Sequence, residues 1–196
     1  MSLSTNSVRA VLERAYSRYV IPSNVKRWNL YPSVDIHPTT RIGLQAKLDP
    51  GNGTITIGRR CHIHDQTMLL PYGGHITMGD DCTVNPFSIL YGHGGLTIGD
   101  NVRIAAATVV IPANHNFDDV DVPIHEQGET REGITIEDDV WIGTGARILD
   151  GVTIGEGSVI GAGSVVTESI PAGSIAAGVP AKVIRSRHDE STQRAQ

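Results

Sequence analysis

A histidine in a polar segment is the first candidate for chemistry in this chain of 196 residues. His115 follows Asn114 in the segment IPANHNF (111–117), and a run of acidic and amide residues comes after it. An imidazole titrates near pH 6.5, so at neutral pH it can take a proton from an attacking hydroxyl. His115 is therefore the candidate general base, and Asp118 and Glu126 are candidates to orient its ring.

The surroundings of His115 are set by a six-residue repeat. From residue 136 onward an aliphatic residue recurs at every sixth position, and the residue four places later is small or branched. Neither a helical period nor simple alternation yields sixes. Short strands joined by tight turns do, with the aliphatic side chain inside and glycine easing many corners. The aliphatic positions are Ile136, Ile142, Ile148, Ile154, Ile160 and Val166.

Three hexads make one coil of a solenoid. Aliphatic triplets begin at positions 36, 57, 78, 98, 136 and 154, and the early intervals of about 21 residues include Gly-rich insertions. The interval of 38 is one coil plus 20 residues, which places a long excursion at about 114–133. We expect six or seven coils over 34–185, stacked at the strand spacing of about 4.8 Å. Long loops on rigid scaffolds commonly carry function, and this one contains His115.

Composition agrees with a β-rich fold. Isoleucine and valine together number 39 against 10 leucines, which favours strands and argues strongly against a mainly helical protein. The formal charge of −5 argues against a general affinity for nucleic acid, and no apolar run approaches a membrane span of about 20 residues. We expect residues 1–33 to form an N-terminal helical cap, with helical spacing over 6–20, and 186–196 to form a polar tail.

The repeat also assigns the two cysteines. Cys61 and Cys82 each lie four residues after an inward aliphatic position, so both are expected to be buried structural thiols. A buried thiol is a poor nucleophile, and we therefore expect direct acyl transfer without a covalent enzyme intermediate. Two cysteines do not form a disulfide framework, which indicates a cytoplasmic protein.

These hexads resemble those of the hexapeptide-repeat acyltransferases, over about 34–185. The resemblance is greatest to the galactoside/maltose-type and polysaccharide O-acetyltransferases. It implies an all-β, left-handed parallel β-helix, a homotrimer, and acetyl-CoA as donor without a metal. It also implies that His115 is the catalytic base. The segments that carry it are YGHGGLTIGDN (91–101), IPANHNF (111–117), IEDDVWIGTGARIL (136–149), IGAGSVVT (160–167) and AGVPAKVI (177–184).

The resemblance also implies which residues contact acetyl-CoA. Thr144 and Ala162 lie 18 apart, one coil above the other, and small side chains there let the pantetheine arm approach the backbone. An aromatic residue near the thioester matches Trp141. Where many relatives follow the threonine near the cofactor with lysine, this chain has Glu168, which would repel CoA phosphates. The remaining cofactor positions are Thr167, Lys182 and Arg185.

The acceptor pocket is inferred partly from the repeat. His93 lies three residues after Leu90, on the same corner as His115 one coil further on, so the two backbones are expected to be near each other. The residues expected to bind the acceptor are Asn85, Tyr91, His93, Asn114 and Glu126. We expect a hydroxyl of a sugar or glycan as the acceptor, because acids and amides suit hydroxyl recognition.

Other functions remain open on the sequence. The runner-up is N-acetylation of an amino sugar or O-acetylation of serine, although serine acetyltransferases usually carry a large helical domain before the coils. A γ-type carbonic anhydrase shares this helix and holds zinc with three histidines. It pairs one histidine with another five residues on, whereas position 120 here is Val120. A purely structural β-helix would have little use for an Asn-His excursion.

Overall fold

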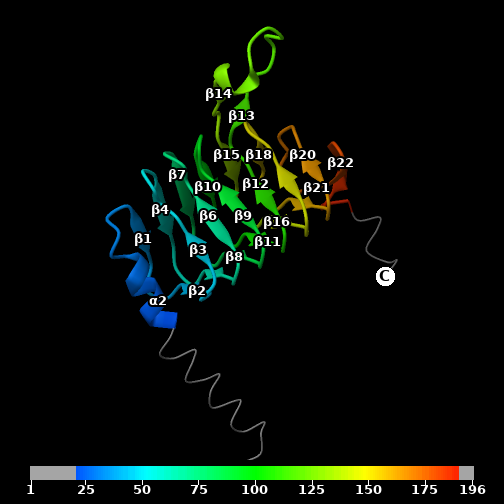
Figure 1. The fold of residues 1–196 in the computed structure, drawn as a ribbon. Helices are drawn as coiled ribbons and strands as arrows, with labels where there is room; N and C mark the ends of the chain where they lie inside the picture. Colours follow the sequence, from blue (N-terminus) through cyan, green and yellow to red (C-terminus); the bar gives the residue numbers. More distant parts are fainter. Residues whose placement is uncertain (1–20, 190–196) are drawn as a thin grey trace, which may run out of the picture.

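A computed structural model describes residues 21–189 and shows a parallel β-helix (Figure 1). The solenoid has three walls, and each coil contributes one strand to each wall. It begins with one short helix, α2 (Ile21–Trp28), whose Val25 is buried against the first coil. The helical spacing predicted over 6–20 lies outside the described residues.

Each wall is a sheet whose strands come from successive coils. Sheet A contains β1 (Val34–Ile36), β4 (Thr54–Ile57), β7 (His75–Met78), β10 (Leu96–Ile98), β15 (Ile134–Ile136) and β18 (Thr153–Ile154). Sheet B contains β2 (Arg41–Ile42), β5 (His62–Ile63), β8 (Thr83–Val84), β11 (Arg103–Ile104), β16 (Trp141–Ile142), β19 (Val159–Ile160), β21 (Ser174–Gly178) and β22 (Ala181–Ser186). Sheet C contains β3 (Lys47–Leu48), β6 (Met68–Leu70), β9 (Ile89–Tyr91), β12 (Val109–Val110), β17 (Arg147–Ile148) and β20 (Val165–Val166).

The strand register confirms the repeat. The first aliphatic residues of the six triplets pair directly across sheet A, in the order Ile36, Ile57, Met78, Ile98, Ile136 and Ile154. A bridge from Ile154 to Ile170 begins a further, partial coil. The fold class predicted from the hexads is therefore confirmed. The last strand departs from it: β22 turns back antiparallel to β21 and covers the end of sheet B.

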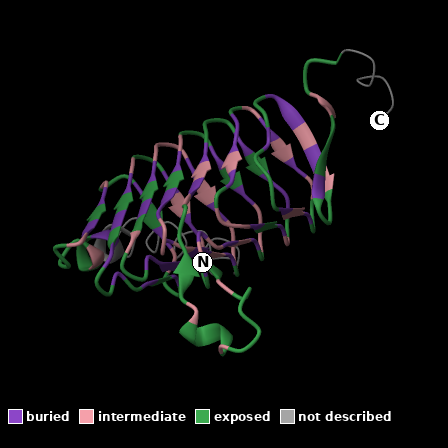
Figure 2. Cartoon of the chain, turned by 90° about the horizontal axis from the view of Figure 1, so that it is seen from above, coloured by how far each residue is buried: buried purple, intermediate pink, exposed green. Residues whose placement is uncertain are grey.

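The interior is a column of aliphatic side chains, because alternate residues of every strand point inward. Figure 2 shows this alternation of buried and exposed residues along each wall. Cys61 and Cys82 are buried in the column, as predicted, and both thiols are free. Contact with Cys61, together with burial, raises the pKa of the Cys82 thiol. The same contact lowers the pKa of the Cys61 thiol, but both residues are only 1% exposed, so neither cysteine is placed to act as a nucleophile.

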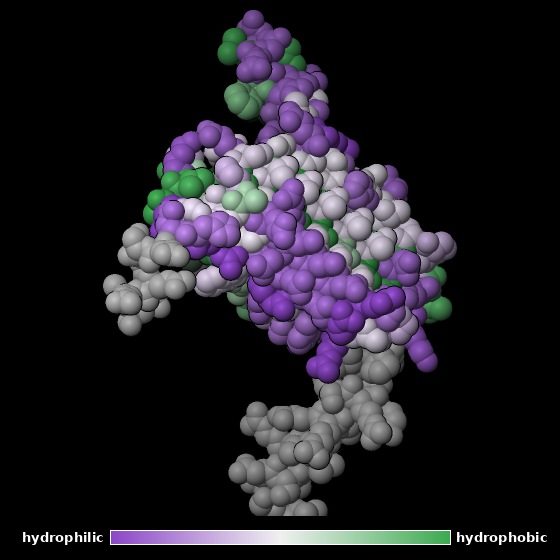
Figure 3. Space-filling view, turned by 180° about the vertical axis from the view of Figure 1, so that it is seen from behind, coloured by the Kyte–Doolittle hydropathy of each residue, from purple (hydrophilic) through white to green (hydrophobic). Residues whose placement is uncertain are grey.

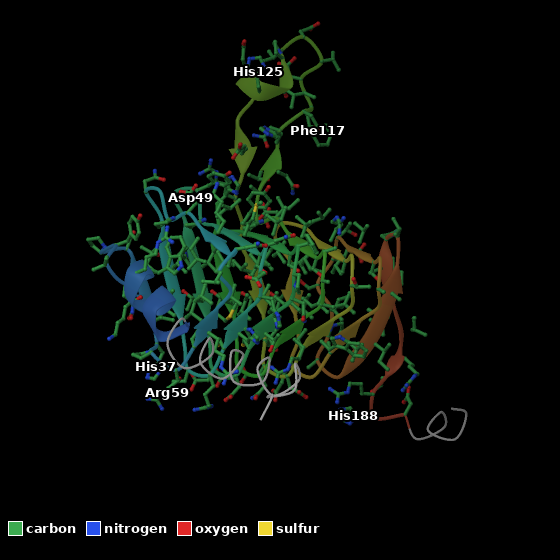
Figure 4. All side chains as sticks on the ribbon, turned by 60° about the horizontal axis from the view of Figure 1, so that its bottom comes forward. His37, Asp49, Arg59, Phe117, His125 and His188 are labelled. Carbon is green, nitrogen blue, oxygen red and sulfur yellow. The ribbon has the colours of Figure 1, made fainter. Side chains whose placement is uncertain are left out.

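Three edges separate the walls. Edge 1 joins sheets A and B, edge 2 joins B and C, and edge 3 joins C and A. The predicted excursion leaves edge 3 after β12 and returns before β15 as an arm (residues 114–130) that stands away from the solenoid (Figure 1). Figure 4 shows Phe117 and His125 on this arm and His37, Arg59 and His188 along the opposite side, at edge 1. In the described part of the chain, no helix has the length and apolar character needed to cross a membrane.

Candidate active site

The arm is a small antiparallel hairpin that carries His115. Strand β13 (Asn114–His115) pairs with β14 (Glu129–Thr130), and a 3-10 helix, η1 (Ile124–Glu126), lies between them. The Gln127 side chain donates to the carbonyls of Asp119 and Val122, both at 2.7 Å, and so ties the tip together. The arm is therefore ordered by its own hydrogen bonds and holds His115 at a defined position.

The antiparallel register places Glu129 directly opposite His115. Nε2 of His115 lies 3.8 Å from Oε1 of Glu129, and the histidine side chain is 59% exposed. The other carboxylate oxygen, Oε2, accepts a hydrogen bond from Arg131 Nε at 3.0 Å and forms an ion pair with Arg131 Nη2 at 2.9 Å. One oxygen of Glu129 is thus held by a guanidinium, and the other faces the imidazole.

Arg131 also fixes the charge of this carboxylate. Its hydrogen bond lowers the pKa of Glu129 below the usual range for glutamate. A carboxyl with a lowered pKa stays ionised as the pH falls and loses its charge only when the pH passes that lowered value. Glu129 is consequently an anion at neutral pH.

This arrangement corrects the prediction about which group orients His115. Glu126 lies on η1 and faces His125, with 3.5 Å between Oε1 and Nε2. Asp118 lines a hollow beside His115 but makes no described ion pair with it. The predicted carboxylates follow His115 in sequence, whereas a hairpin brings the returning strand beside the ring, so the facing carboxylate is Glu129.

His115 lies between two hollows in the arm. The larger, of about 640 Å³, is lined by Asn114, Phe117 and Thr130 among others, and the smaller, of about 330 Å³, by His125, Glu129 and Arg131. His115 lines both. A molecule in the larger hollow could therefore meet the imidazole while Glu129 acts from the smaller one.

At the foot of the arm, Tyr91 and His93 lie together on edge 3, as predicted for adjacent coils. Their ring centroids are 5.6 Å apart, and Tyr72, from the coil before, contacts both. Burial, with the nearby charge of Arg131, lowers the pKa of His93 and keeps its ring neutral. His93 therefore faces the Glu129–Arg131 pair as a neutral ring.

Edge 2 contains a row of small residues on its later coils. Thr144 and Ala162 follow sheet B on neighbouring coils, and the amide of Gly163 donates to the carbonyl of Thr144 at 2.8 Å. The Thr144 hydroxyl donates in turn to Ala106 of the coil before, at 2.7 Å. Earlier coils carry Leu44 and Phe87 on the same edge, both exposed. The stacking predicted from the spacing of 18 residues is confirmed, and in this row the side chains are smaller than Leu44 and Phe87 on the earlier coils.

Comparisons with known proteins agree with these features. The family model described as bacterial transferase hexapeptide (six repeats) matches residues 133–168. A probable acetyltransferase of Mycobacterium tuberculosis is 32% identical over 194 residues, which is 94% of this chain and 64% of that protein. The galactoside O-acetyltransferase of Escherichia coli K12 is 38% identical over 99 residues, 48% of this chain and 45% of that enzyme. The chain thus spans less than two thirds of either relative.

A solved structure extends the likeness to the fold. An N-acyltransferase from Bacillus cereus, crystallised with dTDP-4-amino-4,6-dideoxyglucose and coenzyme A, superposes with a TM-score of 0.68 at 28% identity, over 78% of this chain and 83% of that one. The chain is thus similar to hexapeptide-repeat acyltransferases in both sequence and fold. This confirms the resemblance drawn from the hexads.

The residues expected to contact CoA do not all lie together in this chain. Trp141 is 56% exposed on the outer face of sheet B, close to Thr144 in the chain, and Arg185 lies on β22 of the same sheet. Thr167 follows β20 on edge 3, away from the row of small residues. Lys182 is held by Glu168, at 3.0 and 3.1 Å, so Glu168 neutralises a cation that was expected to face CoA.

The acceptor positions are also divided. Asn85 follows β8 at edge 2, and its side-chain amide donates to the carbonyl of Ile104 at 3.0 Å. Asn85 therefore does not lie beside His93 and His115. Those two histidines were expected on the same corner of adjacent coils, and both belong to edge 3. Within one chain, Asn85 and the row of small residues lie across sheet C from the arm.

Sequence reasoning missed two residues of this site, Glu129 and Arg131, and one residue next to it, Tyr72. Tyr72 lies three residues after Leu69, as His93 lies three after Leu90, so the repeat itself could have identified it. The other two depend on the pairing within the arm, which has no periodic signature. Among residues 21–189, no group of three or more His, Cys, Asp and Glu side chains is arranged to hold a metal ion.

Proposed function

We propose that this chain is an acetyl-CoA-dependent O-acetyltransferase that acetylates a hydroxyl of a sugar or glycan, with His115 as general base. The observation that carries the proposal is the exposed His115 between two hollows, facing an ionised carboxylate, on a hexapeptide-repeat scaffold. Relatives named as acetyltransferases and a neighbour that binds coenzyme A support the donor.

The chemistry is a direct transfer. An unprotonated nitrogen of His115 takes the proton of the acceptor hydroxyl while the oxygen attacks the thioester carbonyl. A tetrahedral oxyanion forms, the C–S bond breaks, and the thiolate of CoA leaves with the proton returned by the imidazolium. Glu129, at 3.8 Å, stabilises the imidazolium while it carries the proton. Backbone amides are suited to stabilise the oxyanion.

The site requires a second copy of the chain. His115 stands on edge 3, whereas Thr144, Ala162 and Trp141 lie on edge 2 or the adjoining wall, with sheet C between them. One chain cannot bring both sets to one acetyl group, but edge 2 of one copy beside the arm of another can. We therefore include a homotrimer with three sites between subunits in the proposal. A mass of about 21 kDa by light scattering, that of one chain, would contradict it.

Recognition of both substrates follows this division. Asn114, Tyr91, His93 and Glu126 are proposed to bind the acceptor around the arm, with Asn85 from edge 2 joining them across the interface. CoA is proposed to lie along Thr144 and Ala162, and Lys182, Arg185 and Thr167 to meet its nucleotide end. A glycan acceptor and two reduced thiols would suit polysaccharide biosynthesis in the cytoplasm.

A second acceptor chemistry is supported by a specific observation. The structural neighbour from Bacillus cereus is an N-acyltransferase bound to an amino sugar nucleotide, so N-acetylation of an amino sugar is the alternative. The nucleophile would then be the neutral amino group of the sugar, and His115 would take its proton as the nitrogen attacks the thioester. The donor and the site would be unchanged.

One acceptor panel tests the proposal. The full chain, acetyl-CoA and a thiol reagent that reports released CoA are combined with neutral sugars, amino sugars, serine and chloramphenicol. We expect a neutral sugar to give the highest kcat/KM. If an amino sugar exceeds every neutral sugar tenfold, the alternative holds, and if serine or chloramphenicol does so, the glycan acceptor is wrong. No CoA release with any acceptor would reject the activity.

A further inference from the structure

Three aromatic side chains form a continuous surface at the foot of the arm. Tyr72 and Tyr91 stack with their ring centroids 5.7 Å apart and their planes 18° from parallel, and Tyr72 lies 4.9 Å from His93. The three residues come from neighbouring coils, β6 and β9 with the turns that follow them. We call Tyr72, Tyr91 and His93 the shelf.

The shelf exposes aromatic surface that nothing in the described chain covers. Tyr72 is 52% exposed, and its position on the coil before His93 puts it further from the arm than His93. Nδ1 of His93 is buried without a hydrogen-bond partner in the described chain. A buried polar atom without a partner costs free energy, on the order of 1–3 kcal/mol, so it needs an explanation beyond packing.

The charges around the shelf do not favour an anionic ligand. Arg131, whose charge acts on His93, is already paired with Glu129 by a hydrogen bond from Nε and an ion pair through Nη2. On the coil before Tyr72, Lys47 pairs with Asp49 at 3.3 Å. His93 itself is neutral, because its pKa is lowered. The shelf therefore offers ring faces and a neutral imidazole, which suit the apolar C–H face of a sugar and one of its hydroxyls.

We infer that the shelf binds a second sugar unit of the acceptor, with Tyr72 as the stacking residue, so that the acceptor is a neutral oligosaccharide and not a monosaccharide or a nucleotide sugar. This rests on the proposed function. The proposed sugar units follow a line along edge 3. The arm presents one unit to His115, His93 lies beside the Glu129–Arg131 pair, and Tyr72 lies one coil further from the arm. Coils are spaced by about 4.8 Å, comparable to the length of one sugar unit.

The test compares acceptors of increasing length in the full chain. Acetyl transfer is measured with glucose, maltose and maltotriose and with cellobiose and cellotriose, in the wild type, Tyr72→Ala and Tyr72→Phe. We expect the wild type to prefer at least one di- or trisaccharide over glucose by about tenfold in kcat/KM, mostly through KM, the size that one aromatic contact supplies. Tyr72→Ala should lose that preference while its glucose kinetics stay within twofold, and Tyr72→Phe should keep it.

A matched control and a binding measurement separate the possible failures. Tyr31→Ala removes a similarly exposed tyrosine beside α2, at the start of the first coil and two coils before Tyr72, and should preserve the preference. Saturation-transfer NMR with maltotriose, cellotriose and dTDP reports binding without catalysis. Trisaccharide binding that depends on Tyr72 but gives no CoA release would sustain the shelf and reject the proposed function. Equal kinetics for all lengths, no trisaccharide binding, or stronger Tyr72-dependent binding of dTDP would overturn the shelf.

Discussion

Edges 1 and 3 of the same solenoid use their side chains in opposite ways. On edge 1, Asp80 accepts a hydrogen bond from the amide of Arg59 at 2.6 Å, Asp100 from that of Asp80 at 2.6 Å, and Asp138 from that of Asp100 at 2.7 Å. Each carboxylate thus caps the coil before its own. Seen from behind, the most hydrophilic side chains form a band below a paler wall and the arm (Figure 3).

On edge 3 the functional side chains make few hydrogen bonds to the solenoid. Its coils turn through glycine-rich segments, the arm departs from it, and His115 and the shelf face solvent. Its side-chain caps in the described chain are on the later coils, where Asp150 accepts from the amides of Glu132 and Gly133 and Ser169 accepts from the amide of Thr153. One repeat therefore builds both a stabilising edge and a reactive one, and the difference is whether side-chain hydrogen bonds are made within the solenoid.

Replacing the general base on edge 3 should have the largest effect on activity and none on stability. His115→Ala is expected to lower kcat by on the order of 10²–10⁴, the usual contribution of a general base. The melting temperature and oligomer mass should not change, because the exposed ring supports neither the core nor edge 1. Steady-state kinetics and a thermal melt check this. Near-normal turnover at saturating substrates would remove His115 from the mechanism.

Bulk on edge 2 should affect the donor and not the acceptor. Ala162→Tyr and Thr144→Tyr are each expected to raise the KM for acetyl-CoA by on the order of tenfold or more, since a crowded site commonly costs 1–3 kcal/mol. Leu44→Tyr, on the same edge but the first coil, serves as the control and should leave this KM unchanged. An unaltered CoA affinity in both tyrosine variants would place the donor elsewhere.

Glu129 tests whether edge 3 holds a working pair. Glu129→Gln keeps the shape but removes the charge facing His115, and we expect kcat to fall about tenfold with little change in either KM, as for a partly exposed charge pair. Asp121→Asn removes another carboxylate of the arm and is the control. In a His115→Ala background, Glu129→Gln should have no further effect. An additive loss in the double variant would show that Glu129 acts independently of His115.

Edge 1 should respond in stability alone. Asp100→Ala leaves the amide of Asp80 without its acceptor and is expected to cost about 1 kcal/mol, or roughly 2–4 °C in melting temperature. Asp100→Asn retains an acceptor oxygen and should recover most of that loss. The kcat of both variants should remain within twofold of the wild type. A tenfold loss of kcat without a change in melting would contradict the division between the edges.

The pattern of inward residues could be predicted from the sequence because it repeats. Each aliphatic residue of a hexad pairs with its equivalent one coil away, so position along the chain dictates position in the wall. The burial of Cys61, the stacking of Thr144 on Ala162 and the site of the excursion follow from the same counting. Asn85 was misplaced beside His93 although the hexad count puts it one edge earlier.

What the sequence by itself determined is the solenoid, its register, and His115 on the arm. The tertiary structure decided which groups meet that histidine. A carboxylate 14 residues away in sequence faces it only because β13 and β14 pair antiparallel, and Arg131 then holds one of its oxygens. Periodic hydrophobic burial sets every coil by the same local rule, whereas contacts within a single irregular hairpin depend on how that hairpin closes, which no repeat encodes.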